Sequence, residues 1–93
     1  MKQGADLLNM GQGGPAIYLS WDATASWDRL RHDLKTRVLL ELQRPDRSRM
    51  HRTYSGTWML AVDSYRVLFE STEKDVTIVG VLTPREYEAG GKW

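Results

Sequence analysis

Cysteine is absent from this 93-residue sequence, which excludes disulfide scaffolds, thiolate nucleophiles and cysteine-based zinc sites. Only two histidines, His32 and His51, could join carboxylates as metal ligands, so we expect neither a metal ion nor another cofactor. The sequence also lacks any apolar run near the roughly 20 residues that cross a bilayer. No basic stretch followed by an apolar segment comes after Met1, so we expect no signal peptide, no membrane partner and a cytoplasmic location.

A large net charge is lacking as well, since the formal charge is only +1. Taken alone, this value argues against a nucleic-acid partner. The charge is unevenly distributed, however, because residues 44–66 hold five Arg and two Asp, whereas residues 67–93 hold three basic and five acidic residues. Nine of the 13 basic residues are Arg, whose planar guanidinium suits bidentate contact with phosphate. A GC-rich coding bias would produce the same excess of Arg.

The first half of the chain contains a leader, a strand and a helix. Residues 1–15 include a Gly- and Pro-containing stretch and are predicted to be a flexible leader. Residues 16–21 alternate and are rich in β-formers, which predicts a strand. Asp22 is placed to cap a helix that ends before Pro45, and a kink near His32 is compatible with the pattern. The apolar residues of this helix form one stripe: Ala23, Trp27, Leu30, Leu34, Val38 and Leu42.

A polar, basic connection over residues 44–53 leads into a three-stranded antiparallel meander. The strands and turns follow in the order 56–62, Asp63-Ser64, 65–70 and 76–82, with Pro84 after the last strand. We therefore expect an α+β domain over residues 16–88 and a tail over residues 89–93. In this domain a helix or helical hairpin packs on one face of a mainly antiparallel, twisted sheet, and the other face is free for function.

Arg66 lies inside a strand of mostly apolar residues. Alternation places Val67 and Phe69 on one side of the sheet and Arg66 on the other. If the aromatic side chains face the helix, Arg66 stands on the open face. The alternative is an exposed arginine that pairs with Glu70 or Asp63 and has no catalytic role.

The region around Arg66 contains a longer motif. It reads Tyr54-Ser55-Gly56-Thr57-Trp58-Met59-Leu60-Ala61-Val62-Asp63-Ser64-Tyr65-Arg66-Val67-Leu68-Phe69-Glu70, followed by Val76-Thr77-Ile78-Val79. This segment resembles the RelE/ParE superfamily of toxins, in which a glycine, an aromatic residue, an alternating strand, a tight turn and Tyr-Arg-Val precede a Val-rich last strand. The resemblance extends over about residues 16–88 and is most specific over residues 54–79. It implies a small RelE-like fold with helices against a twisted, mainly antiparallel sheet.

In the RelE branch, the resemblance implies a toxin of a type II toxin–antitoxin system that cleaves mRNA in the ribosomal A site without a metal ion. The ribose 2′-hydroxyl attacks the adjacent phosphate, and Arg66 matches the family arginine that would stabilise the crowded phosphorane. Arg85 and Tyr87 correspond, with an offset of about one residue, to the basic pair and tyrosine that follow the last strand in the family.

Three positions depart from the RelE pattern. Met59 and Ala61 stand where the strand before the Tyr-Arg motif commonly carries basic residues, and Pro84 stands at an expected basic position. The alternatives are therefore a ParE-like, non-enzymatic inhibitor of DNA gyrase and a catalytically silent protein that binds RNA or the ribosome.

His51 is a candidate general acid or base, since the ordinary pKa of an imidazole, near 6.5, suits proton transfer at neutral pH; the alternative is a surface histidine in a basic loop. The basic connection supplies a candidate RNA-binding cluster of Arg44, Arg47, Arg49 and Arg52. These arginines could contact RNA or DNA phosphates or an acidic antitoxin segment, or they could form a solvated loop. The expected partners are a cognate antitoxin, the ribosome and mRNA, with DNA gyrase as the alternative.

Overall fold

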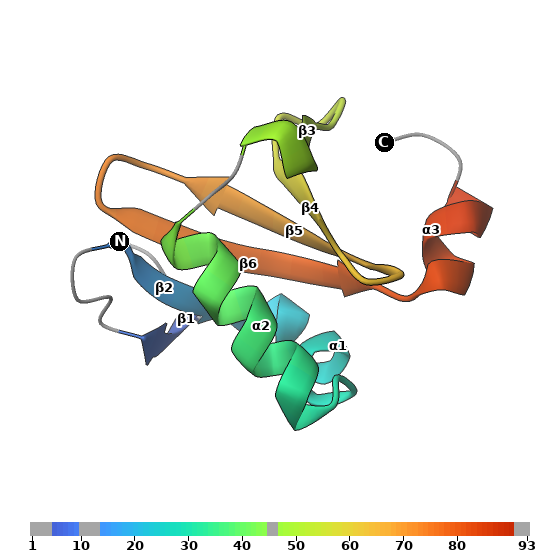
Figure 1. The fold of residues 1–93 in the computed structure, drawn as a ribbon, viewed down its shortest axis with the longest axis horizontal. Coiled ribbons are helices and arrows are strands. Elements are labelled where there is room, and N and C mark those ends of the chain that lie inside the picture. Colours follow the sequence, from blue (N-terminus) through green and yellow to red (C-terminus); the bar gives the residue numbers. More distant parts are fainter. Residues whose placement is uncertain (1–4, 10–13, 45–46, 91–93) are drawn as a thin grey trace.

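The computed structural model describes residues 5–9, 14–44 and 47–90 (Figure 1). The elements, in chain order, are β1 (Ala5–Asn9), β2 (Ala16–Ser20), the 3₁₀ helix η1 (Trp21–Ala23), α1 (Thr24–Asp28), α2 (His32–Gln43), the 3₁₀ helix η2 (Arg47–Arg49), β3 (Met50–Arg52), β4 (Trp58–Val62), β5 (Tyr65–Ser71), β6 (Asp75–Leu82) and α3 (Pro84–Gly90).

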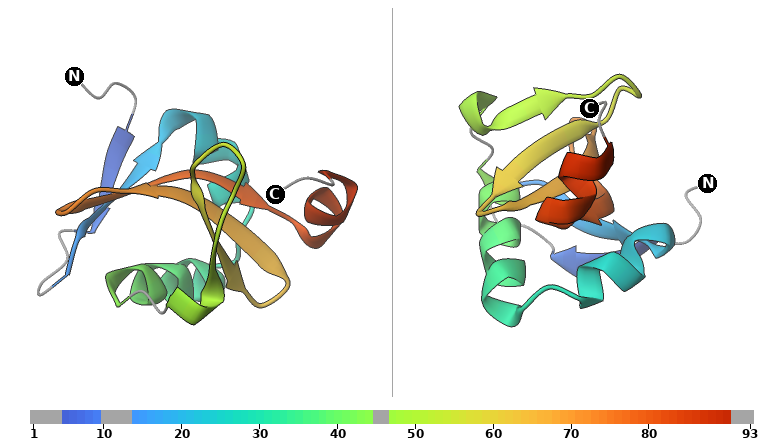
Figure 2. Two further views of the ribbon diagram at one scale, coloured as in Figure 1. Left: turned by 90° about the horizontal axis from the view of Figure 1, so that it is seen from above. Right: turned by 90° about the vertical axis from the view of Figure 1, so that its right-hand side faces the viewer.

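One six-stranded sheet organises the described part of the chain, with the strand order β1-β2-β6-β5-β4-β3. β2 and β6 are parallel, and the other neighbouring pairs are antiparallel. The helix α2 lies against one face of this twisted sheet (Figure 2), where it contacts β2 and β4, and α1 contacts β6 and shares the same core cluster. The expected α+β fold is therefore confirmed, as is the antiparallel meander β4-β5-β6.

The apolar stripe predicted for the helical segment is buried along its whole length, from Ala23 to Leu42. Of the two predicted forms, a helix or a helical hairpin, the structure has two helices: the chain leaves helical geometry between α1 and α2, next to the kink allowed near His32, where the Leu30 amide bonds to the carbonyl of Trp27 (3.0 Å). The prediction that Asp22 is the cap is wrong, since Ser20 Oγ accepts from the Asp22 amide (3.3 Å). A straight helix over these residues would be about 30 Å long, and the turn instead keeps the stripe against the sheet.

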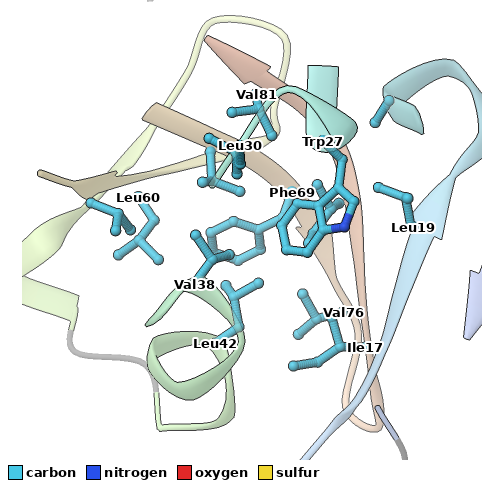
Figure 3. Close-up of a cluster of buried hydrophobic side chains, with 14 of the residues drawn as sticks. Ile17, Leu19, Trp27, Leu30, Val38, Leu42, Leu60, Phe69, Val76 and Val81 are labelled. Atoms are coloured by element: carbon cyan, nitrogen blue, oxygen red, sulfur yellow. The ribbon is translucent and has the colours of Figure 1, made fainter. Parts of the chain in front are cut away.

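The hydrophobic core lies between the helices and the sheet (Figure 3). Alternate residues of the central strands point into it, including Val67 and Phe69 of β5 and Ile78 of β6. Trp27 of α1 and Val38 of α2 reach the same cluster from the opposite layer. The core covers one face of the sheet. A ligand that binds to the sheet would therefore contact the other face or the edges.

Three elements go beyond the sequence prediction. Within the predicted leader 1–15, β1 forms an edge strand in which Leu7 pairs with Tyr18, while residues 1–4 and 10–13 lie outside the described residues. β3 forms inside the predicted basic connection. Met50 packs against the core, and this anchors residues 50–52 as an edge strand paired with β4.

α3 is the third of these elements. β6 ends before Pro84, as predicted, but Pro84 then begins a helix that extends through Gly90 into the predicted tail, whose residues 91–93 lie outside the described residues. α2 ends at Gln43, and Pro45, predicted to end it, is likewise outside the described part. Among the described helices, none has the length and hydrophobicity that a membrane crossing requires.

Candidate functional site

The sheet face opposite the helices carries Arg66. Its neighbours Val67 and Phe69 are buried toward the helices, so alternation turns the half-buried Arg66 to the open face, as predicted. The register places Arg66 between Ala61 of β4 and Leu82 of β6. The guanidinium therefore rises from the middle strand of the meander, flanked by apolar positions.

Arg66 is held by backbone and aromatic contacts rather than by an acid. Its Nη1 donates to the carbonyl oxygens of Tyr65 (3.0 Å) and Asp63 (3.5 Å), and its Cζ lies 4.6 Å from the centroid of the Tyr87 ring. The Asp63 carboxylate is engaged elsewhere, by Arg37 of α2 (3.0 Å). Within the described ranges, no carboxylate lies within ion-pair distance of Arg66, so its charge is available to an anionic ligand.

Tyr87 reaches Arg66 because α3 packs beside β5 and β6. The first turn of α3 is a capping box: Glu86 Oε1 accepts from the Thr83 amide (2.9 Å), and Thr83 Oγ1 accepts from the Glu86 amide (3.1 Å). Pro84 occupies the first helical position, where a missing amide is tolerated. Arg29, at the end of α1, lies 3.6 Å from Glu86 Oε2 and ties α3 to the helical layer.

Acid is expected to loosen α3 and release Tyr87 from Arg66. The hydrogen bond from the Thr83 amide, aided by the nearby Arg29 charge, lowers the pKa of Glu86 from its ordinary value of 4.5. A lowered folded-state pKa means that the carboxylate's stabilisation is complete above 4.5 and is lost as the pH falls through the lowered value. The ¹³Cα chemical shifts of α3 should then move toward random-coil values in an NMR pH titration.

Two variants separate this capping interaction from general acid effects. Glu86→Gln should remove the pH dependence of the α3 shifts, whereas Glu88→Gln, on the same helix but outside the capping box, should keep the wild-type profile. An α3 that stays helical throughout the acid titration, or that responds equally to both variants, would contradict the capping role of Glu86.

The other two predicted catalytic residues, Arg85 and His51, do not contact Arg66 in the way that Tyr87 does. Arg85 lies exposed on α3, two residues from Tyr87. His51 of β3 is paired with Met59, which lies two residues along β4 from the partner of Arg66. Strand geometry therefore separates the Cα atoms of His51 and Arg66 by about 12 Å. Arg66 and Tyr87 come together, and His51 lies on the same face but two strands away.

β4 contributes no ionisable group to the open face beside Arg66. Met59 and Ala61, the two departures from the RelE pattern, alternate with residues that face the core and so lie on the open side. Met59 is nevertheless only 5% exposed. Phosphate contacts and proton transfer at this site would therefore depend on Arg66 and on residues from α3 and β3.

The predicted basic cluster does not join Arg66. Arg52 is paired with Trp58, which packs against the core, and its Cζ lies 5.1 Å from the Trp58 ring centroid, on the helix side of the sheet. Arg49 forms an ion pair with Glu41 of α2 (2.8 Å), also on that side. Arg44 is exposed at the end of α2, and the side chain of Arg47 lies outside what the structure describes.

A pocket of about 550 Å³ opens on the helix side, and its residues were not predicted as a site. It is lined by Arg31 and Leu34 near the start of α2 and by Asp63, Ser64 and Tyr65 at the β4–β5 turn. These two segments are about 30 positions apart in the sequence, so no local motif marks the pocket. In the described part of the chain, no group of three or more His, Asp or Glu side chains could hold a metal ion.

Comparison with known proteins adds no relative: no protein-family model matches the sequence, and neither the curated proteins nor the solved structures contain a match.

Proposed function

We propose that this protein is a RelE-like toxin of a type II toxin–antitoxin pair, which cleaves mRNA on the ribosome without a metal ion. The observation that carries the proposal is the state of Arg66, a half-buried guanidinium on the open sheet face that contacts Tyr87 and has no acidic partner in the described ranges. The α+β fold, with a helical pair on one face of a mostly antiparallel sheet, agrees with the architecture that the resemblance implies.

The chemistry requires charge stabilisation and two proton transfers. The ribose 2′-oxygen forms a bond to the adjacent phosphorus and loses its proton to a base, and the bond from phosphorus to the 5′-oxygen breaks as that oxygen gains a proton. The Arg66 guanidinium would bind the non-bridging oxygens as negative charge develops on them. Tyr87, Arg85 and His51 are the candidates for proton transfer and phosphate contact.

Expression of the chain without its antitoxin is expected to arrest growth and translation. Primer extension on cellular mRNA should reveal cleavage within codons that occupied the A site, and purified ribosomes should be required for cleavage in vitro. Growth arrest with intact transcripts would reject the nuclease activity. The expected protein partner, a cognate antitoxin, should suppress both effects when the two proteins are expressed together.

The second candidate is a ParE-like inhibitor of DNA gyrase, and the absence of ionisable groups on the open side of β4 favours it. An inhibitor that only binds needs no proton-transfer residues beside Arg66. A supercoiling assay with purified gyrase separates the two functions, because inhibition there without any effect on translation would support the ParE-like alternative. Co-sedimentation with ribosomes in the absence of cleavage would instead indicate a catalytically silent ribosome-binding protein.

A further inference from the structure

The loop between β3 and β4 presents Tyr54 to solvent. Tyr54 is 86% exposed, whereas the next most exposed large apolar side chain in the described part of the chain, Trp21, is 64% exposed. The loop projects beyond the layered body of the molecule in Figure 2. An exposed tyrosine ring offers an apolar face on which a flat ligand group can stack, with a polar hydroxyl at its edge.

The loop beneath Tyr54 is held by a network of hydrogen bonds. The Thr53 amide donates to the carbonyl of Thr57 (2.9 Å), and the Gly56 amide donates to the carbonyl of Thr53 (3.0 Å). The hydroxyls of Thr53, Ser55 and Thr57 bond to one another at 2.8 to 3.2 Å. Gly56 has φ = +92°, a conformation that favours glycine. Because the backbone of the loop is already hydrogen-bonded, a ligand that binds at Tyr54 does not have to order it.

The segment that carries Tyr54 is basic in sequence. No Asp or Glu occurs between Asp46 and Asp63 in the sequence. Arg52 is fixed at the base of the loop, because its Nε donates to the carbonyl of Gly56 (3.1 Å) and its guanidinium lies over Trp58. In the described ranges Arg52 has no acidic partner, so its charge can meet a phosphate group.

We propose that the β3–β4 loop binds single-stranded nucleic acid, with a base stacked on Tyr54 and a backbone phosphate at Arg52. Exposed aromatic rings beside fixed arginines are the combination that binds single strands without sequence preference. Extended RNA fits better than an acidic peptide, because a peptide of the same charge would use Arg52 but would have no base to place on the ring.

This site lies apart from Arg66. Trp58, where β4 begins after the loop, is about 10 Å along the strand from the partner of Arg66, and Tyr54 is farther along the chain. The inference goes beyond the proposed function, because stacking at Tyr54 requires no cleavage. If the proposed function holds as well, the stacked nucleotide lies several positions from the bond that is cut.

The test measures binding of the full chain to a short fluorescein-labelled oligodeoxyadenylate by fluorescence anisotropy. This probe has no 2′-hydroxyl, so it cannot be cleaved by the proposed reaction. Tyr54→Ala is expected to weaken binding by about tenfold, the effect of losing one stacked base. Tyr54→Phe keeps the ring and should bind as the wild type does. Trp21→Ala removes another exposed aromatic residue, on η1, and should leave the affinity unchanged.

Arg52 is tested through the salt dependence of the same binding. Arg52→Ala should reduce the slope of log affinity against log salt concentration by about 0.7, the value for one phosphate contact on a single strand. An unchanged slope would reject the phosphate contact. Comparison with the matching oligoriboadenylate then determines whether RNA or DNA is the preferred strand.

Three results would overturn the inference: wild-type affinity in Tyr54→Ala, an equal loss in Trp21→Ala, or displacement of the probe by polyglutamate as effectively as by unlabelled oligonucleotide. The last would identify an acidic protein segment as the occupant. Melting temperatures of the variants, expected to match the wild type because both rings are exposed, exclude unfolding as the cause. Tyr54-dependent binding by a chain that leaves translation intact would keep this inference and reject the proposed nuclease function.

Discussion

Under the proposed nuclease function, Arg66→Ala is expected to lower the rate of ribosome-dependent mRNA cleavage by at least about a hundredfold, the effect of removing one preorganised group that binds developing negative charge. The reason is local. Arg66 is flanked in the sheet by Ala61 and Leu82, neither of which could take over a phosphate contact. The measurement is single-turnover cleavage of mRNA on purified ribosomes, together with recovery of growth when the variant is expressed without an antitoxin.

Two further variants make this result specific. Arg66→Lys keeps the positive charge but loses the planar fork, so we expect partial activity between the wild type and Arg66→Ala. Lys35→Ala removes a positive charge from α2, on the helical layer of the fold, and should cleave at the wild-type rate. Wild-type cleavage by Arg66→Ala, or an equal loss in Lys35→Ala, would contradict a catalytic role for Arg66. Unchanged melting temperatures would exclude unfolding.

The centre of the fold was predictable because its patterns are repeated over many residues. Alternation along β5 and β6 identified which side chains face the core, and the turn at Asp63 and Ser64 followed from residue type, with Asp63 taking φ = 53°. The apolar stripe from Ala23 to Leu42 was likewise correct as a list of buried residues. Burial patterns report which side faces the core and are insensitive to small breaks in the backbone.

The break between α1 and α2 is an example of a backbone feature that the burial pattern does not reveal. Trp27 and Leu30 keep the spacing of one helix on both sides of the turn, and neither Gly nor Pro interrupts the sequence there. The turn is determined by the surface being covered, since α1 contacts β6 while α2 crosses to β2 and β4. Tertiary packing of this kind overrides local propensity.

The edges of the sheet were missed because short strands carry little pattern. β3 has only three residues and depends on its register with β4, and β1 lies at the opposite edge of the described sheet, paired with β2. α3, in contrast to these strands, has a clear local sequence signal. Thr83 and Glu86 form a capping box, and Pro84 occupies the first helical position between them. That signal was readable in the sequence.

The candidate site was predictable in part for the same reasons. Strand alternation was sufficient to place Arg66 on the open face, but the Tyr87 ring reaches it only through α3. The basic cluster was predicted from charge density alone, which contains no information about sheet faces. The register of β3 on β4 places Arg52 beside Trp58 on the helix side of the sheet. Arg52 and Arg66 therefore lie on opposite faces of the sheet.

Phe69→Ala is expected to destabilise the fold by about 3–5 kcal/mol, because it removes a large ring from a site that cannot fully collapse. Phe69 is 1% exposed and lies on β5 between Trp58 of β4 and Ile78 of β6, inside the cluster drawn in Figure 3. Small domains unfold with about 5–15 kcal/mol in total, so this loss would leave a large unfolded fraction in any chain near the lower limit.

Urea unfolding monitored by tryptophan fluorescence and by far-ultraviolet circular dichroism measures the loss caused by Phe69→Ala. Phe69→Leu retains most of the buried volume and should be less destabilising, whereas Leu40→Ala, on the exposed side of α2, should change the stability by no more than about 0.5 kcal/mol. Equal losses for Phe69→Ala and Leu40→Ala would contradict the position of Phe69 in the core. Under the proposed function, the loss of toxicity in Phe69→Ala should follow the unfolded fraction and be relieved at lower temperature, whereas Arg66→Ala should be inactive while fully folded. The two variants therefore distinguish a loss of stability from a loss of the site.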